Sequence, residues 1–197
     1  MSPITHFLAG WVLLERRQAC LRDKALVALA GVAPDLDGLG LVVDAATRLL
    51  GMPETNYYQA FHRVYGHGLP AALLIAVLAG ALGTRRWQTA CWAFVSVHLH
   101  LLCDLLGSRG TTSADLWGIW YLAPFSTRHG LVWTGQWPLV GWQNIALTAV
   151  LIVLAMERAT RVGYSPVALV SARGDEAFIA TLRYRKRWLL GLLGRDA

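Results

Sequence analysis

The chain has 197 residues, a length typical of one domain, of which 55% are hydrophobic and only 15% are charged. Soluble domains contain about 25% charged residues, so this composition excludes an ordinary water-soluble globule and predicts an integral membrane protein. The net charge of +6 is also found in nucleic-acid-binding proteins, but here the basic residues form short clusters beside apolar runs, as in membrane proteins, so no nucleic-acid partner is expected.

Five apolar stretches follow one another along the chain: residues 3–14, 25–43, 69–83, 87–106 and 138–156. The last two are long enough to cross a hydrocarbon core, which takes about 20 helical residues, and the third is marginal. The first is short and the second is broken at Pro34, so both need protein or a water-filled cavity around them at membrane depth. We therefore predict an all-α membrane domain at residues 1–156 with about four to five membrane-embedded helices.

The remaining residues, 157–197, form a more polar and basic C-terminal tail. Its stretch Arg183–Leu190 combines basic residues with Tyr184, Trp188 and two leucines, a pattern typical of a helix lying on a membrane surface. A disordered basic tail is the alternative interpretation. Five of the nine tryptophans stand between Trp117 and Trp142, as expected near a headgroup boundary.

Loop charges predict the orientation of the chain. If the stretches alternate in direction, residues 15–24, 84–87 and 157–197 share one side and hold 14 of the 18 Lys and Arg residues. Cytoplasmic loops of membrane proteins are enriched in Lys and Arg. We therefore predict a multi-pass protein of the cell (inner) membrane with its C-terminus in the cytoplasm.

Several His and Asp residues interrupt the apolar stretches, where an Asp at a helix centre costs about 2.5–3.5 kcal/mol on insertion scales. His100 and Asp104 stand four residues apart in a predicted helix, so they share a face and can bind the same cation. A hydrogen bond between helices is the alternative for this pair. Asp35 and Asp37 follow Pro34 and precede more apolar sequence, so they either cap a helix or bind a metal.

Two further histidines precede the third stretch. His62 is followed by Arg63, and His67 lies between two glycines that allow the backbone to bend around the imidazole. His6 lies close to the start of the first stretch. His98 is about 200° around the helix from His100, which favours a hydrogen bond to another helix rather than a shared site. His129, in a Trp-rich loop, is interpreted as a surface residue.

The predicted orientation brings the other polar residues together. His6, Asp35, Asp37, His62, His67, His100 and Asp104 all fall at the membrane face opposite the basic loops. Residues with unrelated structural roles would have no reason to sort to one face. We therefore predict a shared metal site on the extracytoplasmic side.

The order of these motifs resembles the membrane-bound metal-dependent hydrolases of the YdjM-like family. The resemblance rests on Thr5-His6, Pro34-Asp35-Leu36-Asp37, His62-Arg63 with Gly66-His67-Gly68, and His100 with Asp104, and it covers roughly residues 1–125. That family is distantly similar to zinc-dependent phospholipases C and to nucleases of the same helical fold. The resemblance implies a hydrolase with His100, Asp104, Asp37 (or Asp35) and His67 (or His62) as ligands, and His6 as a further candidate.

The expected cofactor is one or two Zn²⁺ ions or another divalent metal, because the last apolar stretch lacks the additional His and Glu ligands of the soluble phospholipases. The metal would activate a water molecule, Asp35 would act as general base, and Arg63 would hold the negative charge of a phosphoryl group. A phosphoester or lipid-linked substrate is expected from analogy alone. The expected partners are membrane lipid and a small-molecule or lipid substrate. The alternative is a metal-binding or transport membrane protein without hydrolytic activity.

Overall fold

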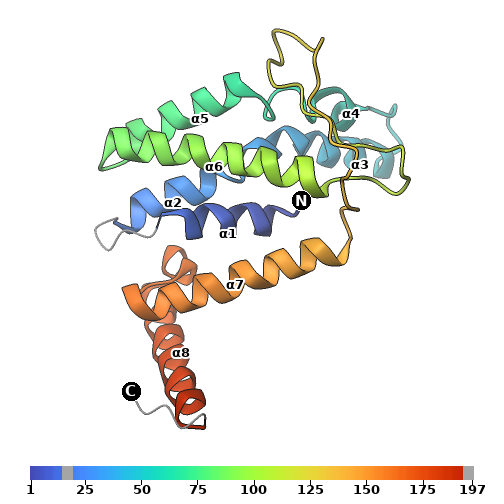
Figure 1. The fold of residues 1–197 in the computed structure, drawn as a ribbon. Helices are drawn as coiled ribbons and strands as arrows, with labels where there is room; N and C mark the ends of the chain where they lie inside the picture. The colour runs from blue at the N-terminus through green and yellow to red at the C-terminus, as the bar shows by residue number, and fades with distance from the viewer. Residues whose placement is uncertain (15–19, 193–197) are drawn as a thin grey trace.

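The computed structural model of the chain describes residues 1–14 and 20–192, and helices dominate it (Figure 1). The helical elements, in order, are α1 (Pro3–Leu13), α2 (Leu21–Ala30), the 3-10 helix η1 (Ala33–Leu39), α3 (Gly40–Leu49), α4 (Tyr57–Phe61), α5 (Leu69–Leu82), α6 (Arg86–Gly107), α7 (Trp142–Val162), the 3-10 helix η2 (Pro166–Leu169) and α8 (Ala172–Leu192). Within these described residues there are two isolated β-bridges and no strand. The all-α prediction is therefore confirmed.

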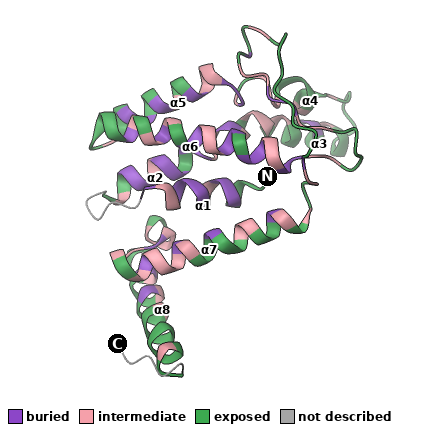
Figure 2. Cartoon of the chain, in the orientation of Figure 1, coloured by how far each residue is buried: buried purple, intermediate pink, exposed green. Residues whose placement is uncertain are grey.

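Helix α6 lies at the centre of a bundle and packs against α1, α2 and α5. Small residues line these contacts: Ala30, Ala72, Ala79, Ala93 and Val97 form one buried cluster. At Gly80 of α5 a Cβ atom would come within 2.9 Å of the Cβ of Ala90, so only glycine allows α5 and α6 to approach this closely. Close packing through small residues is typical of helices in membranes. Figure 2 shows the buried residues on the helix faces that meet.

Local sequence signals set the helix ends that position the polar residues. The hydroxyl of Ser2 accepts a hydrogen bond from the amide of Thr5, and Pro3 occupies the first turn, so α1 begins at a capped end. Pro34 stands in the first turn of η1, and α2 is bent by 50° relative to the segment from Ala33 to Leu49. The predicted break in the second apolar stretch is therefore confirmed, and it places Asp35 and Asp37 in the turn.

Among the described residues, α6 is the one helix that is long and apolar enough to cross a membrane by itself. The bent pair formed by α2 and the segment Ala33–Leu49 would make a second span if it crosses as one unit, and α1 and α5 are shorter apolar helices. Helix α7 begins four residues later than the apolar stretch predicted at 138–156 and extends to Val162. The number of helices embedded in the membrane stays a prediction.

The long segment 108–141 joins α6 to α7 and lies across one end of the bundle (Figure 1). Two buried amides hold it in place. Gln136 donates to the carbonyl of Trp117 at 2.6 Å and accepts from its amide at 2.8 Å. Asn144 donates to the carbonyl of Gly107 at 2.8 Å and accepts from the indole of Trp137 at 2.6 Å. These bonds order the segment 108–141, which we call the cover segment, although its composition alone predicts only a loop.

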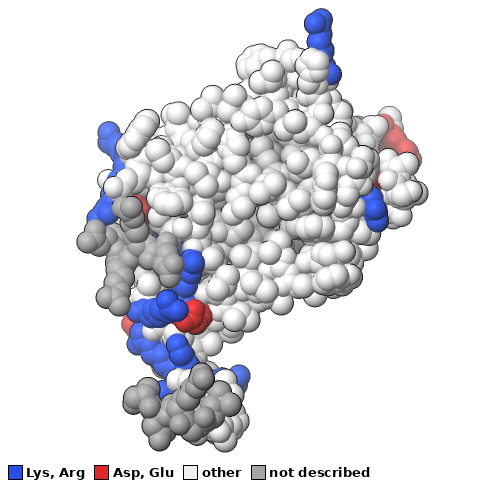
Figure 3. Space-filling model, in the orientation of Figure 1, with Lys and Arg blue, Asp and Glu red and all other residues white. Residues whose placement is uncertain are grey.

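Most Lys and Arg side chains visible in Figure 3 gather at the end of the bundle where α5 turns into α6 and along α8. The cover segment lies at the opposite end. Residues 15–19 of the predicted basic loop, and residues 193–197 of the tail, lie outside the described residues. The sorting of basic residues to one end agrees with the predicted pattern, but which side of a membrane this end faces stays a prediction.

Candidate metal centre

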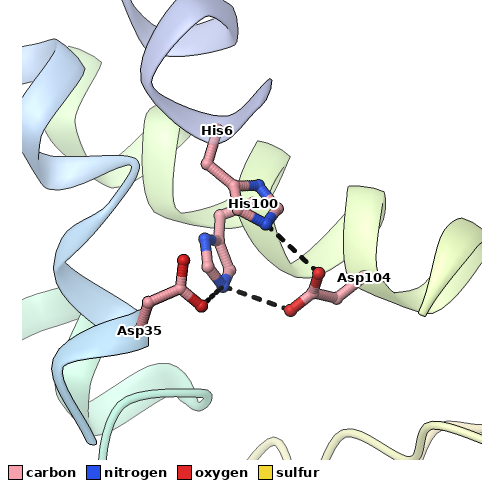
Figure 4. A group of neighbouring side chains, drawn as sticks. All are labelled: His6, Asp35, His100 and Asp104. Carbon is pink, nitrogen blue, oxygen red and sulfur yellow. Dashed lines mark ion pairs between the residues drawn. The ribbon is translucent and has the colours of Figure 1, made fainter. Parts of the chain in front are cut away.

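Four His and Asp side chains meet at the covered end of the bundle (Figure 4). They are His6 from α1, Asp35 from η1, and His100 and Asp104 from α6, and their ligand atoms lie within 4.8 Å of one another. We refer to these four residues as the inner group. His100 and Asp104 share a helix face, as predicted, and their Nε2 and Oδ2 atoms are 3.3 Å apart.

His67, from the loop before α5, adds a fifth side chain to the inner group. Its Nε2 atom lies 3.2 Å from His100 Nε2, 3.5 Å from Asp104 Oδ2 and 3.9 Å from Asp35 Oδ1. On the other side of the inner group, His6 Nε2 lies 3.2 Å from Asp104 Oδ1. Three imidazoles and two carboxylates therefore point at one small volume.

The hydrogen bonds behind two of these imidazoles define which nitrogen faces inward. His100 Nδ1 lies 2.8 Å from the carbonyl of Gly31, and His67 Nδ1 lies 3.0 Å from Asp37 Oδ2. Because both partners are acceptors, each Nδ1 carries the proton, and a neutral ring then presents the lone pair of Nε2 to the inner group. Two such lone pairs 3.2 Å apart repel each other unless a proton or another cation lies between them.

The inner group also contains buried polar atoms without hydrogen-bonding partners. Both ring nitrogens of His6 and the Oδ2 atom of Asp35 are in this state among the described residues, although His6 Nε2 lies within ion-pair distance of Asp104 Oδ1. His6 is almost completely buried, and its ring lies against that of His100 with centroids 3.8 Å apart and ring planes inclined by 31°. Unpartnered polar atoms in a buried position are destabilising, and an ion that they can coordinate removes this cost.

Asp37 belongs to a second, adjacent cluster, which we call the outer group: Asp37, His62 and His67. Its Oδ1 atom lies 2.7 Å from His62 Nδ1, and its Oδ2 atom accepts from His67 Nδ1 and from the amides of Arg63 and Gly66. A Cβ atom at Gly66 would lie 2.2 Å from the carbonyl oxygen of Pro34, so glycine is required for this approach. Asp37 is therefore fully engaged in hydrogen bonds.

His67 links the two groups, because Nδ1 belongs to the outer group and Nε2 faces the inner group. Burial acts to lower the pKa of His67, but the carboxylates of Asp104 and Asp37 outweigh this effect and raise the pKa to about 9. The surroundings of this ring therefore favour positive charge. The same electrostatic preference would favour a bound cation next to its Nε2 atom.

Arg63 lies beside the outer group in an unusual backbone conformation, with φ of 77°. Its guanidinium carbon sits 3.7 Å from the centre of the Trp117 ring. Burial lowers the pKa of Arg63. Arg63 lines a cavity of about 220 Å³ together with Tyr58, Gln59 and Thr127. His62 of the outer group also lines this cavity. A fixed cation at the wall of a cavity can bind an anion.

Other predicted residues lie apart from the inner group. His98 binds the hydroxyl of Tyr121 at 2.9 Å and the carbonyl of Phe94 at 2.8 Å, so its long-range partner is in a loop rather than in another helix. His129 is exposed in the cover segment. Exposure of His129 agrees with its interpretation as a surface residue.

Sequence reasoning missed three groups that surround the site. The amino group of Met1 contacts Asp104 Oδ1 and donates to Ser108 Oγ at 2.6 Å, and Ser108 donates to Asp104 Oδ1 at 2.9 Å. The carbonyl of Gly31 fixes His100. Ser108 follows Asp104 by four residues, and this spacing weakly indicates that the two side chains meet on one helix face. Backbone groups such as the carbonyl of Gly31 leave no such pattern in the sequence.

A family model described as YdjM inner membrane protein matches residues 1–185 of the chain. Neither a curated protein nor a solved structure matches it.

Proposed function

The chain belongs to the YdjM inner membrane protein family, and we propose that it is a membrane-bound metal-dependent hydrolase whose metal centre is the inner group together with His67. One observation carries the proposal. His6 and Asp35, whose side chains hold buried polar atoms without a hydrogen-bonding partner, lie around the point where the Nε2 atoms of His67 and His100 converge. A divalent cation at that point would be coordinated by one nitrogen of His6 and one oxygen of Asp35 together with these Nε2 atoms.

The donor set fits zinc or a similar metal. Imidazole nitrogens and carboxylate oxygens are common ligands of Zn²⁺, and catalytic sites use three protein ligands with an open position. Here His6, His67 and His100 offer nitrogens and Asp104 and Asp35 offer oxygens, and three or four of these five donors would bind the metal and leave a position open for water. When bound, the metal would act as a Lewis acid and activate a water molecule for attack.

The geometry favours one metal rather than two. Asp37 accepts the Nδ1 proton of His67, which is the arrangement by which a carboxylate orients a metal-binding histidine from behind. His62 in turn holds the other oxygen of Asp37. In this proposal Asp37 and His62 position His67, whereas the sequence analysis named both as candidate ligands, with Asp35 and His67 as the alternatives. Asp35, predicted as the base, lies in the inner group.

Asp35 is suited to two roles. Its side chain is 22% exposed, whereas those of His6, His67 and His100 show no exposed surface, so a substrate would reach the centre beside Asp35. The Oδ1 atom lies 3.8 Å from His100 Nε2, and Oδ2 has no partner. Asp35 can thus bind the metal through one oxygen and accept a proton from water through the other.

Arg63 and two cavities favour a phosphate ester attached to an apolar group. The guanidinium of Arg63 would hold the phosphoryl oxygens in the cavity of about 220 Å³. A larger, mostly apolar hollow of about 620 Å³ lies between the start of α1 and the first half of α7, and Met1, whose amino group contacts Asp104, is one of its lining residues. Such a hollow would accommodate the lipid part of a substrate.

We further propose four to five membrane-embedded helices, with the metal centre at the extracytoplasmic face and the C-terminus in the cytoplasm. The basic residues near the α5–α6 turn and on α8, at the end away from the cover segment, support this orientation.

The test is hydrolysis of a chromogenic phosphodiester and of phospholipids by protein purified in detergent and loaded with Zn²⁺. Arg63→Ala should lower kcat/KM by roughly ten- to a hundredfold, as expected when a charged hydrogen bond of about 1.5–3 kcal/mol is lost. Its metal content should not change. Arg128→Ala, in the exposed part of the cover segment, is the matched control and should leave the rate unchanged.

Chelation should abolish turnover, and restored metal should restore it. Metal-loaded, folded protein that cleaved no phosphoester, carboxylic ester or amide would contradict the hydrolase proposal. Metal binding or transport without hydrolysis would then be the better account of the same site.

A further inference from the structure

The outer half of α8 exposes large apolar side chains beside a run of basic ones. Every residue from Arg183 to Leu192 is exposed except Leu190, which is half-buried. Tyr184, Trp188 and Leu192 each expose more than half of their surface. Four basic residues, Arg183, Arg185, Lys186 and Arg187, lie in the same stretch. Water is an unfavourable solvent for this apolar surface, so another phase or molecule should cover it.

The exposed apolar and basic side chains occupy different sides of the helix, whereas the half-buried Leu190 falls on the basic side. At 100° per residue, Tyr184, Trp188, Leu189 and Leu192 fall on one side, and Arg183, Lys186 and Arg187 fall on the opposite side. Arg185 alone lies on the apolar side, where its long side chain can extend toward polar surroundings. This division is typical of a helix that lies in the plane of a membrane interface.

The inner half of α8 is fixed to the bundle, so its direction is determined. Asp175 is buried and accepts hydrogen bonds from the amide and the hydroxyl of Ser165, which precedes η2. Arg183 Nε donates to the carbonyl of Thr160 near the end of α7 at 3.1 Å. Helix α8 therefore leaves α7 at a braced corner and projects away from the bundle (Figure 1).

The charge at this end of the molecule indicates what covers the helix. Arg85 and Arg86 stand at the α5–α6 turn, and this turn lies at the same end of the bundle as the start of α8 (Figure 1). A surface of this sign attracts anions, and each Lys or Arg near an anionic membrane contributes about 1 kcal/mol. The apolar side would be covered by acyl chains, and the basic side chains would contact phosphate groups.

We propose that the outer half of α8 lies on the surface of the bilayer and binds anionic phospholipid headgroups. Tyr184, Trp188 and Leu192 enter the boundary between headgroups and acyl chains, while Arg183, Lys186 and Arg187 remain at the level of the phosphates. This binding site is separate from the metal centre and does not depend on hydrolysis.

The test uses the whole protein in nanodiscs, with the native Cys20, Cys91 and Cys103 replaced by Ala. Single cysteines at Trp188→Cys and Lys186→Cys carry a nitroxide, and its collisions with oxygen and with a neutral, water-soluble nickel chelate are measured. In phosphatidylcholine containing phosphatidylglycerol, the probe at 188 should collide severalfold less with the chelate, and more with oxygen, than the probe at 186.

Two comparisons make the result specific. The difference in chelate access between positions 186 and 188 should decrease in nanodiscs of phosphatidylcholine alone. It should also decrease in anionic nanodiscs when Arg185→Gln and Arg187→Gln remove two charges and leave the hydrogen bond of Arg183 to Thr160 in place. Loss of two charges should lower the equilibrium constant for binding of the outer half of α8 to the bilayer surface by on the order of tenfold or more. Equal, high chelate access at both positions in anionic nanodiscs would overturn the proposal. If duplex DNA then bound the same surface in a mobility-shift assay, α8 would be a nucleic-acid contact instead.

Discussion

The inner and outer groups consist of the same residue types and lie side by side, yet only the inner group contains buried polar atoms without hydrogen-bonding partners. In the outer group, both oxygens of Asp37 accept hydrogen bonds from histidines or backbone amides. In the inner group, both nitrogens of His6 and one oxygen of Asp35 have no hydrogen-bonding partner. Buried polar atoms in native proteins are almost always satisfied. The inner group could therefore hold a cation, whereas the outer group satisfies the polar atoms of Asp37 by itself.

This difference separates two roles that a list of His and Asp residues does not distinguish. A residue that faces an ion must leave a lone pair free, and a residue that positions a ligand must use its atoms in hydrogen bonds. His67 does both, because its Nδ1 is bound to Asp37 and its Nε2 faces His100. The comparison predicts a gradient of effects on metal binding from the inner group outward.

The largest loss of metal affinity is expected when His100 or Asp104, which share one face of α6, is replaced. His100→Ala or Asp104→Ala removes one ligand, and a structural zinc site of four ligands binds with about 10–16 kcal/mol, so each ligand contributes a few kcal/mol. Metal affinity, measured by competition with a chelator of known affinity, should fall by roughly two to three orders of magnitude.

His98→Ala is the matched control, because His98 lies on the same helix but binds Tyr121. It should leave metal affinity unchanged. Wild-type protein that stays empty in excess zinc, or equal losses in His98→Ala and His100→Ala, would contradict the assignment of the inner group.

The sequence predicted the helical fold and the meeting of these residues for physical reasons that the structure makes plain. His100 and Asp104 are one helical turn apart, which fixes their common face without knowledge of the fold. Pro34 predicted the break that places Asp35 and Asp37 in a turn. The alternation of apolar stretches then brought distant residues to one end of the bundle.

The division into two groups could not be predicted in the same way. Asp35 and Asp37 are two residues apart in the 3-10 helix η1, so the sequence treats them alike. The path of the loop from His62 to His67 determines that its amides donate to Asp37 and not to Asp35. The amide of Gly66 that binds Asp37 and the carbonyl of Gly31 that binds His100 are backbone groups, present at any residue. The basic tail also had two interpretations, and packing of Ile179 and Asp175 against the bundle favours the helix.

An intermediate effect is expected when the carboxylate behind His67 is neutralised. Asp37→Asn keeps the shape of the side chain but weakens the charge that holds the Nδ1 proton of His67. Loss of such an outer carboxylate typically lowers metal affinity by about 10–100-fold. The chelator competition should therefore place Asp37→Asn between wild type and His100→Ala. A loss as large as that of His100→Ala would show that Asp37 is itself a ligand.

The smallest effect is expected at His62, and it decides between one metal and two. His62 is half-buried, and its Nδ1 lies 2.7 Å from Asp37 Oδ1, a position that the amide nitrogen of asparagine can also reach. His62→Asn should therefore keep the hydrogen bond to Asp37 and remove an imidazole. If the outer group only positions His67, metal content measured by mass spectrometry should stay at about one equivalent per chain, and the affinity for the metal should fall by less than about tenfold.

If the outer group bound its own ion, wild type would hold two equivalents and His62→Asn one, because Asp37 and His67 alone would leave that ion too few ligands. His62→Ala provides the comparison within the pair: it loses both the imidazole and the hydrogen bond, so it should weaken the single site more than His62→Asn does without changing the stoichiometry.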